Sequence, residues 1–314
     1  MIWDFAWVVP TILTIITAST PLLLPALGEL VAERSGVLNL GVEGMMLVGA
    51  ISAFAVGIST GSWVLAVLAG AAAGSVMAFL FGFLTLTLLA NQVATGLALS
   101  IFGIGLSALM GAGFVGVPFP GLPKLDIPFL SDIPVIGPLV FGHDLLVYLS
   151  FAMVAFVAWF IYRSRPGLIL RAVGENHDAA HSIGHPVIMV RYLAVLFGGA
   201  MAGLGGAHLS LAYTPMWAEN MTAGRGWIAL ALVVFSSWKP LRALLGAYIF
   251  GGINILQLHV QGFGEDIGVA IPSQLLSMLP YLATILVLVL ISMDSARGRL
   301  NAPACLGKVF HPAA

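Results

Sequence analysis

Two glycine patterns match motifs that position reactive groups in other proteins. Residues 111–116 spell G-x-G-x-x-G, the spacing of a dinucleotide-binding turn, but they close an apolar helix and no strand precedes them. Residues 57–61 spell G-x-S-x-G, the spacing of a hydrolase nucleophile turn, but they join two apolar segments with no His or Asp nearby in sequence. Neither pattern therefore predicts catalysis.

The histidines and lysines give no stronger signal. His177 and His181 are four residues apart and could share a helix face, but zinc would need further ligands. The phosphate-binding pattern G-x-x-x-x-G-K-[ST] is absent, because none of the three lysines follows such a glycine loop. We predict no catalytic residue, no metal ligand and no ATP hydrolysis through a P-loop of this chain.

The composition explains why soluble chemistry is not expected. Hydrophobic residues make up 60% of the 314 residues, charged residues only 8%, and the formal net charge is −1. A soluble domain carries about 25% charged residues, so a soluble enzyme and a basic nucleic-acid binder are both excluded. We predict an all-α, polytopic membrane helix bundle in a single domain, 1–314. The one cysteine, Cys305, cannot form an intrachain disulfide.

Apolar runs between polar or Gly/Pro breaks predict nine spans. They cover residues 7–28, 38–58, 63–89, 93–117, 145–162, 192–213, 227–238, 241–258 and 273–292. A straight helix needs about 20 residues to cross the hydrocarbon core, so 227–238 is either lengthened by its flanks or a partial, broken span. The first run lacks a basic region before it, and we expect it to remain as a span.

Two polar stretches interrupt this pattern, at 28–44 and 213–226. Their charged or amide residues are Glu29, Glu33, Arg34, Asn39 and Glu43 in the first and Glu219, Asn220 and Arg225 in the second. Non-helical backbone within a membrane persists only where protein buries it or water lines it, and transporters use such segments along substrate paths. Each stretch is either an interfacial loop or part of a pathway, and we expect at least one to line a pathway.

The basic residues predict the orientation. They gather in the loop 163–191, at Lys239 and Arg242, and in the tail between 297 and 308, which nine spans place on one side. The positive-inside rule makes that side cytoplasmic. The C-terminus is then cytoplasmic, whereas the N-terminus and the proline-rich loop 118–144 lie outside.

Five blocks of sequence carry a resemblance to a known family. They are ERSGVLNLGVEGMMLVGA (33–50), ANQVATGLALSIFGIGLSAL (90–109), RPGLILRAVGENHDAAHSIG (165–184), GRGWIALALVVFSSWKP (224–240) and LPYLATILVLVLI (279–291). In this order they resemble the permease subunits of bacterial ABC importers of the ribose and branched-chain amino acid type. The closest likeness is to the nucleoside branch, whose binding component is a basic-membrane-protein-type lipoprotein. The resemblance implies a type II ABC importer-like fold with short or broken helices.

The resemblance also implies a mechanism and partners. Such a permease carries nucleosides, or simple sugars, by alternating access in the bacterial cytoplasmic membrane. Its implied partners are a cytoplasmic ABC ATPase, a second homologous permease and an extracytoplasmic substrate-binding lipoprotein or periplasmic protein. ATP and Mg would bind the ATPase, so no cofactor is expected on this chain, and no nucleic acid.

By position, the resemblance places a coupling helix to the ATPase in the loop 163–191. Its residues would be Arg171, Gly174, Glu175, Asn176, Ala179 and Ala180. The apolar residues 172, 173, 179, 180 and 183 could form one small face, although composition alone also permits a solvated connector. Relatives often carry Pro where this chain has His177, a difference that affects docking contacts rather than the assignment.

We predict a substrate pathway at the following five polar residues: Asn39, Glu43, Asn91, Gln92 and Thr95. A carboxylate inside a membrane is costly and by default indicates function. For Glu43 the alternative is a structural ion pair with Arg34. Amides and small residues suit a nucleoside and a sugar alike, so these residues do not identify the substrate.

Two other classes of protein stay open as alternatives. A secondary transporter or channel would need no ATP, but ion coupling usually requires several carboxylates or histidines at mid-membrane depth, and Glu43 is the main candidate. An intramembrane enzyme would need a Ser–His or metal constellation. His208 is the only histidine well inside an apolar span apart from His259 at an end, and no such constellation is found.

Overall fold

The structure is a computed structural model that describes residues 5–124, 133, 136–266 and 302–311, with scattered positions between 275 and 289. Its helices are α1 (Phe5–Arg34), α2 (Val42–Thr60), α3 (Trp63–Gly82), α4 (Gln92–Gly111), α5 (Ile136–Phe141), α6 (Leu145–Arg163), α7 (Arg165–Glu175), α8 (His177–Ser182), α9 (Val187–His208), α10 (Arg225–Phe235) and α11 (Pro240–Asp266). Single turns of π-helix, η1 (Phe83–Thr87) and η2 (Leu209–Tyr213), continue α3 and α9.

Seven of the described helices are long and apolar enough to cross a membrane. They correspond to predicted spans one to six and eight, and the predicted polytopic helical bundle is confirmed. The seventh predicted span, 227–238, corresponds to α10. Its 11 residues are too few for a full crossing, so of the two alternatives it is the partial span. The ninth predicted span, 273–292, lies largely outside the described residues.

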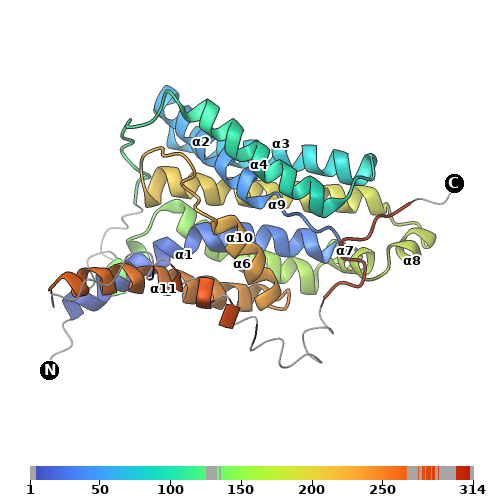
Figure 1. Ribbon diagram of the computed structural model, residues 1–314. Coiled ribbons are helices and arrows are strands. Elements are labelled where there is room, and N and C mark those ends of the chain that lie inside the picture. Colours follow the sequence, from blue (N-terminus) through green and yellow to red (C-terminus); the bar gives the residue numbers. More distant parts are fainter. Residues whose placement is uncertain are drawn as a thin grey trace.

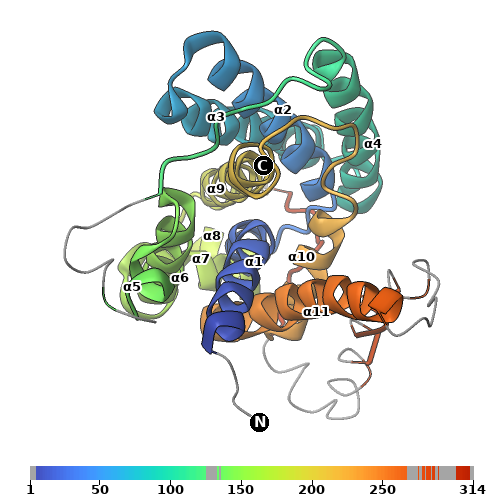
Figure 2. The same cartoon turned by 90° about the vertical axis from the view of Figure 1, so that its left-hand side faces the viewer.

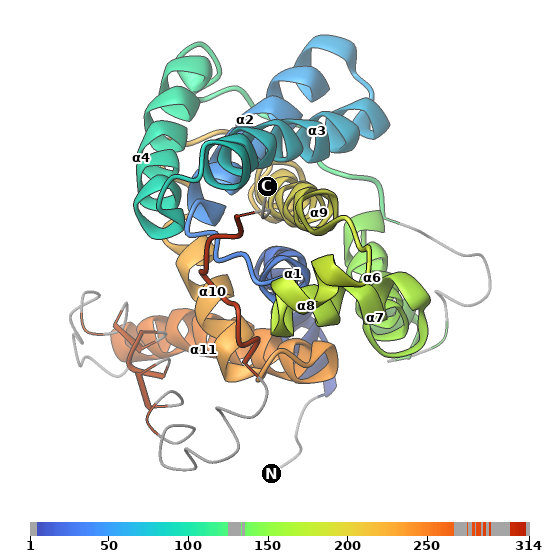
Figure 3. The same ribbon diagram turned by 90° about the vertical axis from the view of Figure 1, so that its right-hand side faces the viewer.

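The long helices run roughly along one axis, with the N-terminus at one end and the last described residues at the other (Figure 1). Seen along this axis, α1 and α9 lie at the centre; α2 and α3 flank α9, α4 lies on the outer side of α2, and α6, α10 and α11 surround α1 (Figures 2 and 3). We call the end with α7, α8 and residues 302–311 the α8 end, and the opposite one the N-terminal end.

Small residues bring α3 and α9 into close contact. A Cβ atom on Gly203 would lie 2.1 Å from the carbonyl oxygen of Gly70, and one on Gly199 would lie 2.4 Å from that of Gly74. Any larger residue would therefore push the two helices apart. Small residues at this interface thus allow the two backbones to approach closely.

Several predicted boundaries differ from the structure, and two of them change how the polar stretches are interpreted. The first span was expected to end at residue 28, yet α1 continues to Arg34 and only residues 35–41 leave the helix. The polar side chains of its last turns are not released to water, because they are buried against other parts of the chain. The fourth span was expected to reach residue 117, yet α4 ends at Gly111.

The chain after α4 forms a layer across the N-terminal end instead of continuing the helix. Val115 pairs with Trp217, and Pro118 pairs with Met216. The backbone N–H of Leu122 donates to the carbonyl of Leu211 at 3.0 Å. Two loops far apart in sequence therefore close this end together.

Candidate functional site

The helix α10 begins inside the bundle, and Glu43 holds its start. The Glu43 carboxylate, on the first turn of α2, is 2% exposed. It accepts hydrogen bonds from the Thr222 hydroxyl, from the N–H of Gly224 at 2.8 Å and from the N–H of Gly226 at 2.7 Å. The first N–H groups of a helix lack partners within the helix and carry partial positive charge, so a buried carboxylate is well matched to them.

This geometry bears on one of the two alternatives for Glu43. Among the described residues its hydrogen-bond partners lie at 222, 224 and 226 and not at Arg34, so the alternative of an ion pair with Arg34 is wrong, whereas a role in the pathway stays a prediction. The contact also requires a glycine, because a Cβ on Gly226 would lie 2.6 Å from the Glu43 Cα. The two polar stretches therefore meet, and Glu43 joins α2 to the start of α10.

The other end of α10 is held by the end of α1. The indole N–H of Trp238 donates to Glu33 Oε2 at 2.6 Å, and Arg34 Nη2 donates to the Trp238 carbonyl at 3.1 Å. Ser237 and Trp238 have positive φ values of 50° and 55°, which non-glycine residues rarely adopt. Charged residues of the first polar stretch thus hold both ends of the half-length helix.

The non-helical segment 35–41 is held by side chains from α1 and α4. Asn39 is fully buried; its Nδ2 donates to Glu29 Oε1 at 3.0 Å and its Oδ1 accepts from the Gly41 N–H at 2.9 Å. Gln92 Oε1 accepts from the Leu38 N–H at 2.8 Å. Backbone groups that a membrane would leave without water are thereby satisfied.

The five predicted pathway residues fall into two groups. Asn39, Glu43 and Gln92 are buried around residues 35–41, whereas Asn91 is exposed and Thr95 half-buried on α4. Asn91 caps α4 by accepting from the Ala94 N–H at 3.0 Å. Glu29 Oε2 and Gln92 Nε2 are among the buried polar atoms that find no hydrogen-bond partner within the described part of the chain. The role of these residues in a pathway stays a prediction.

The predicted coupling helix is divided between α7 and α8. Asn176 separates them and caps α8 by accepting from the Ala179 N–H at 2.9 Å. Of its six predicted residues, Glu175, Asn176 and Ala179 are exposed, Arg171 is partly buried, and Gly174 and Ala180 are packed inward. The prediction of one apolar face is wrong, because residues 173 and 180 are buried whereas 179 and 183 point away from the bundle.

Arg191 joins α8 to the rest of the protein. Its guanidinium, on α9, is 1% exposed and donates to the Ser35 carbonyl at 3.2 Å and the Lys308 carbonyl at 3.2 Å. A third contact, at 3.1 Å, runs from Nη2 to Nδ1 of His177 on α8. Burial and the positive charge of Arg191 lower the pKa of His177, so His177 is neutral at pH 7 and Nδ1 can accept this bond.

Residues 302–311 complete the α8 end. The Cys305 N–H donates to the Gly174 carbonyl at 2.9 Å, and the Gly307 N–H donates to the Gly36 carbonyl at 3.0 Å. The Phe310 ring lies against both His177 and His181, with centroids 5.2 and 5.4 Å away. This segment therefore connects α7, α8 and residues 35–36.

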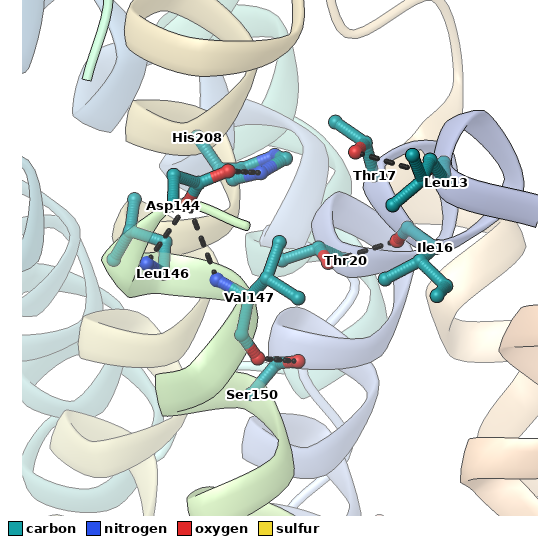
Figure 4. A network of polar contacts seen from close by, with 9 residues as sticks. All are labelled: Leu13, Ile16, Thr17, Thr20, Asp144, Leu146, Val147, Ser150 and His208. Carbon is teal, nitrogen blue, oxygen red and sulfur yellow. Dashed lines mark hydrogen bonds and ion pairs between the residues drawn. The ribbon is translucent and has the colours of Figure 1, made fainter. Parts of the chain in front are cut away.

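A second buried polar pair lies toward the N-terminal end (Figure 4). Asp144 caps α6 by accepting from the N–H groups of Leu146 and Val147, and its Oδ2 lies 3.4 Å from Nε2 of the fully buried His208. Burial alone would raise the pKa of Asp144, but the neighbouring imidazole of His208 and the two N–H groups lower it. The pair ties α6 to α9 just before η2.

A cavity of about 460 Å³ opens beside this pair. Its polar lining includes Thr14, Thr17, Lys124, Asp144 and Tyr213. The hydroxyls of Thr14 and Thr17 donate to carbonyls of their own helix. Within the described part of the chain, no group of three or more His, Cys, Asp or Glu side chains could hold a metal ion.

Comparison with known proteins identifies the family. A family model described as the branched-chain amino acid transport system permease component matches residues 11–291. The chain belongs to this family. It is thus a permease subunit of an ABC transporter and a multi-pass membrane protein.

Individual relatives of the permease are similar over nearly its whole length. It is 43% identical to a putative glucose ABC transporter permease protein, TsgC13, of Haloferax volcanii over 93% of this chain and 94% of the relative. It is 33% identical to the nucleoside permease NupC of Lactococcus lactis over 87% and 89%, and 33% identical to the guanosine permease NupQ of Bacillus subtilis over 94% and 96%. No solved structure matches the chain.

Two of the polar contacts that join distant parts of this permease were missed in the sequence analysis. Arg191 was counted only as a loop charge, although a lone arginine one turn into an apolar helix is a sign of a buried polar contact. His208 was recognised as an intramembrane histidine, but its partner Asp144 lies 64 positions away and was assigned to an outer loop.

Proposed function

We propose that this permease carries nucleosides inward, driven by ATP hydrolysis on a separate subunit. The observation that carries the proposal is the family match over residues 11–291, together with two relatives named for nucleoside or guanosine transport that align over at least 87% of this chain. A nucleoside is neutral and offers an aromatic base and hydroxyl groups. Amides and small residues can bind such a solute without a compensating charge.

The partners in this proposal are a cytoplasmic ABC ATPase with its ATP and Mg, a second homologous permease and an extracytoplasmic binding protein. The α8 end would face the cytoplasm, since the basic residues of α6, α7 and the 239–242 turn gather there. The two paired loops at the N-terminal end would then receive the binding protein. Two relatives, NupB and NupC, are named as nucleoside permeases of one organism, which supports pairing with a homologue.

The ATPase contact in this proposal is the exposed side of α8. Ala179 and Ile183 point away from the bundle, and Ile183 is 71% exposed. An exposed isoleucine directly after a short helix at the end of the bundle is suited to a groove on a partner. Arg191 would pass the movement of α8 to residues 35–36 and so toward Asn39, Glu43 and Gln92.

A sugar is the second candidate substrate. The relative with 43% identity is named as a putative glucose permease, and a sugar shares the neutral charge and hydroxyl groups of a nucleoside. The binding protein selects the solute before the permease meets it, so the two candidates must be separated by measurement.

The experiment begins with gentle solubilisation of the tagged permease and mass spectrometry of its stoichiometric companions. The complex is then reconstituted in liposomes with ATP inside, and uptake of labelled guanosine is measured against excess adenosine, ribose and glucose. Guanosine uptake that requires ATP and is displaced by adenosine supports the proposal. Displacement by glucose alone favours the sugar, and uptake by the lone chain without ATP would overturn ATP-driven import.

A further inference from the structure

An apolar groove lies between helices at the α8 end. It has a volume of about 240 Å³, and side chains of α1, α6, α7 and α9 line it. Phe156, Phe160 and Phe197 form an aromatic wall: the first two rings stack at 6.0 Å, and Phe197 lies 6.5 Å from Phe156. Leu193 is 57% exposed and Phe156 43% exposed, so the groove opens on the outer surface of the bundle.

The groove lies at the depth of a membrane leaflet close to its headgroups. Its walls belong to three of the helices long enough to span a membrane. On the last turn of α6, Trp159 and Tyr162 are 57% and 47% exposed. Trp and Tyr gather at the membrane–water boundary, which places the end of α6 at headgroup level. The surface around the groove therefore faces lipid.

Two arginines stand at the headgroup side of the groove. Arg163 is one turn beyond Phe160 on the same face of α6, and Arg165 directly precedes Pro166, which lines the groove. Both are exposed, and within the described residues no Asp or Glu oxygen lies within 4 Å of either guanidinium. The groove is thus apolar with an uncompensated positive rim.

We propose that this groove binds one acyl chain of an anionic phospholipid, with the phosphate at Arg163 and Arg165. An acyl chain gains little by moving from bilayer to groove, because both surroundings are apolar. Preference among lipids therefore comes from the headgroup. Basic residues between helices near the cytoplasmic surface attract anionic headgroups, and one arginine corresponds to about a fivefold preference. This inference rests on the membrane location of the chain and on the orientation proposed above, and not on its substrate.

Native mass spectrometry of the purified, delipidated complex tests the proposal. Phosphatidylglycerol and phosphatidylcholine with identical acyl chains are added at equal concentration. The wild-type complex is expected to bind phosphatidylglycerol at least fivefold more tightly. The double variant Arg163→Gln/Arg165→Gln should lose this preference, whereas Arg242→Gln, an exposed arginine at the same end but outside the groove, should keep it.

A second measurement locates the acyl chain. Phosphatidylglycerol with a photoreactive group on its chain should label peptides that contain Phe156 or Leu193, and Leu193→Trp should reduce this labelling several-fold while the complex stays monodisperse. Equal binding of the two lipids would overturn the proposal. So would an equal loss in Arg242→Gln, which would indicate general attraction to the basic end, or labelling confined to other helices.

Discussion

Glu43 and Arg191 each join a helix to a distant part of the chain, but they do so in different surroundings. Glu43 receives three hydrogen bonds from one neighbouring segment, and its partners are the start of a single helix. Arg191 donates to three separate segments, one of which carries the exposed α8. The first contact holds one helix in place, whereas the second makes the position of α8 depend on residues 35 and 308. The bundle centre is therefore suited to hold its shape, and the α8 end is suited to transmit movement.

The largest effect is expected from Glu43→Gln. The amide can accept from Thr222 and Gly224, but its NH2 group would face the N–H of Gly226, and a buried group without a partner costs about 1–3 kcal/mol. With the lost charge at the start of α10, we expect about 3 kcal/mol of destabilisation. The measurements are the yield of monodisperse protein and the midpoint of thermal unfolding.

The matched control is Glu219→Gln, because Glu219 is an exposed acid on the second polar stretch, 213–226, which also supplies the partners of Glu43. It should change stability by less than about 0.5 kcal/mol. If Glu43→Gln instead accumulates normally and unfolds at the wild-type temperature but transports nothing, Glu43 acts in the pathway and the comparison with Arg191 fails.

The second effect is expected from Arg191→Met, which keeps the apolar stem and removes all three hydrogen bonds. The variant should remain folded, since the methionine keeps the apolar packing of the arginine stem and the three lost bonds lie at one end of the bundle. Reconstituted with its ATPase, it should hydrolyse ATP with about a tenfold lower yield of transported solute. Arg191→Lys should not restore coupling, because an ammonium cannot reach three partners in the fixed geometry of a guanidinium.

Arg242→Met is the control for Arg191, since Arg242 is an exposed arginine at the same end. Normal coupling in Arg191→Met would show that α8 moves independently of residues 35 and 308. In that case the distinction between Glu43, which holds a helix in place, and Arg191, which transmits movement, would be wrong.

Ile183→Asp is expected to change the stability of the permease little and to weaken its assembly with the ATPase. Because Ile183 is 71% exposed, a carboxylate there costs the isolated permease little. Binding of the ATPase should weaken about tenfold, measured as its ratio to the permease after co-purification. Val173→Asp, at a buried position of α7, should instead lower the amount of folded protein. Undiminished ATPase binding in Ile183→Asp would remove α8 from the interface.

The smallest effect is a pH dependence at His177. Its pKa in the fold lies below its ordinary value, so the folded protein binds fewer protons here than the unfolded chain does. The contribution of His177 to stability is full above the unfolded pKa of about 6.5 and is lost as the pH falls below it. The unfolding midpoint should therefore drop between pH 7.5 and 5.5.

His177→Gln keeps an acceptor for Arg191 without titrating, and it should reduce this drop. His181→Gln is the control, because it also lies against Phe310 but is exposed. An identical pH response in all three proteins would mean that other groups cause the loss.

The sequence predicted the helices well where apolar runs are long and uninterrupted. α6 was expected at 145–162 and spans Leu145–Arg163, because Asp144 before it and Arg163 after it mark both boundaries. α1 was expected to end early, because Glu29 and Glu33 look like loop residues until the burial of their partners, Asn39 and Trp238, is known. Hydropathy measures each residue against lipid or water, and it cannot register a polar contact supplied 205 positions later.

The candidate site was also only partly predictable from the sequence. Glu43 was singled out as a carboxylate within the membrane, and it is buried, but its partners could not be deduced, because the Glu43–Gly226 bond joins residues 183 positions apart. The division of α7 from α8 at Asn176 was missed as well. Asn is a preferred helix cap, so this signal was present in the sequence.

The placement of residues 302–311 has a consequence for how the protein is made. These residues leave the ribosome after every helix that they contact, and proteins are synthesised at about 5–20 residues per second. The Cys305–Gly174 and Gly307–Gly36 hydrogen bonds therefore form only when the bundle has already been inserted. Until then the carbonyls of Gly36 and Gly174 lack these partners, and the α8 end acquires its final form only after residues 302–311 have been synthesised.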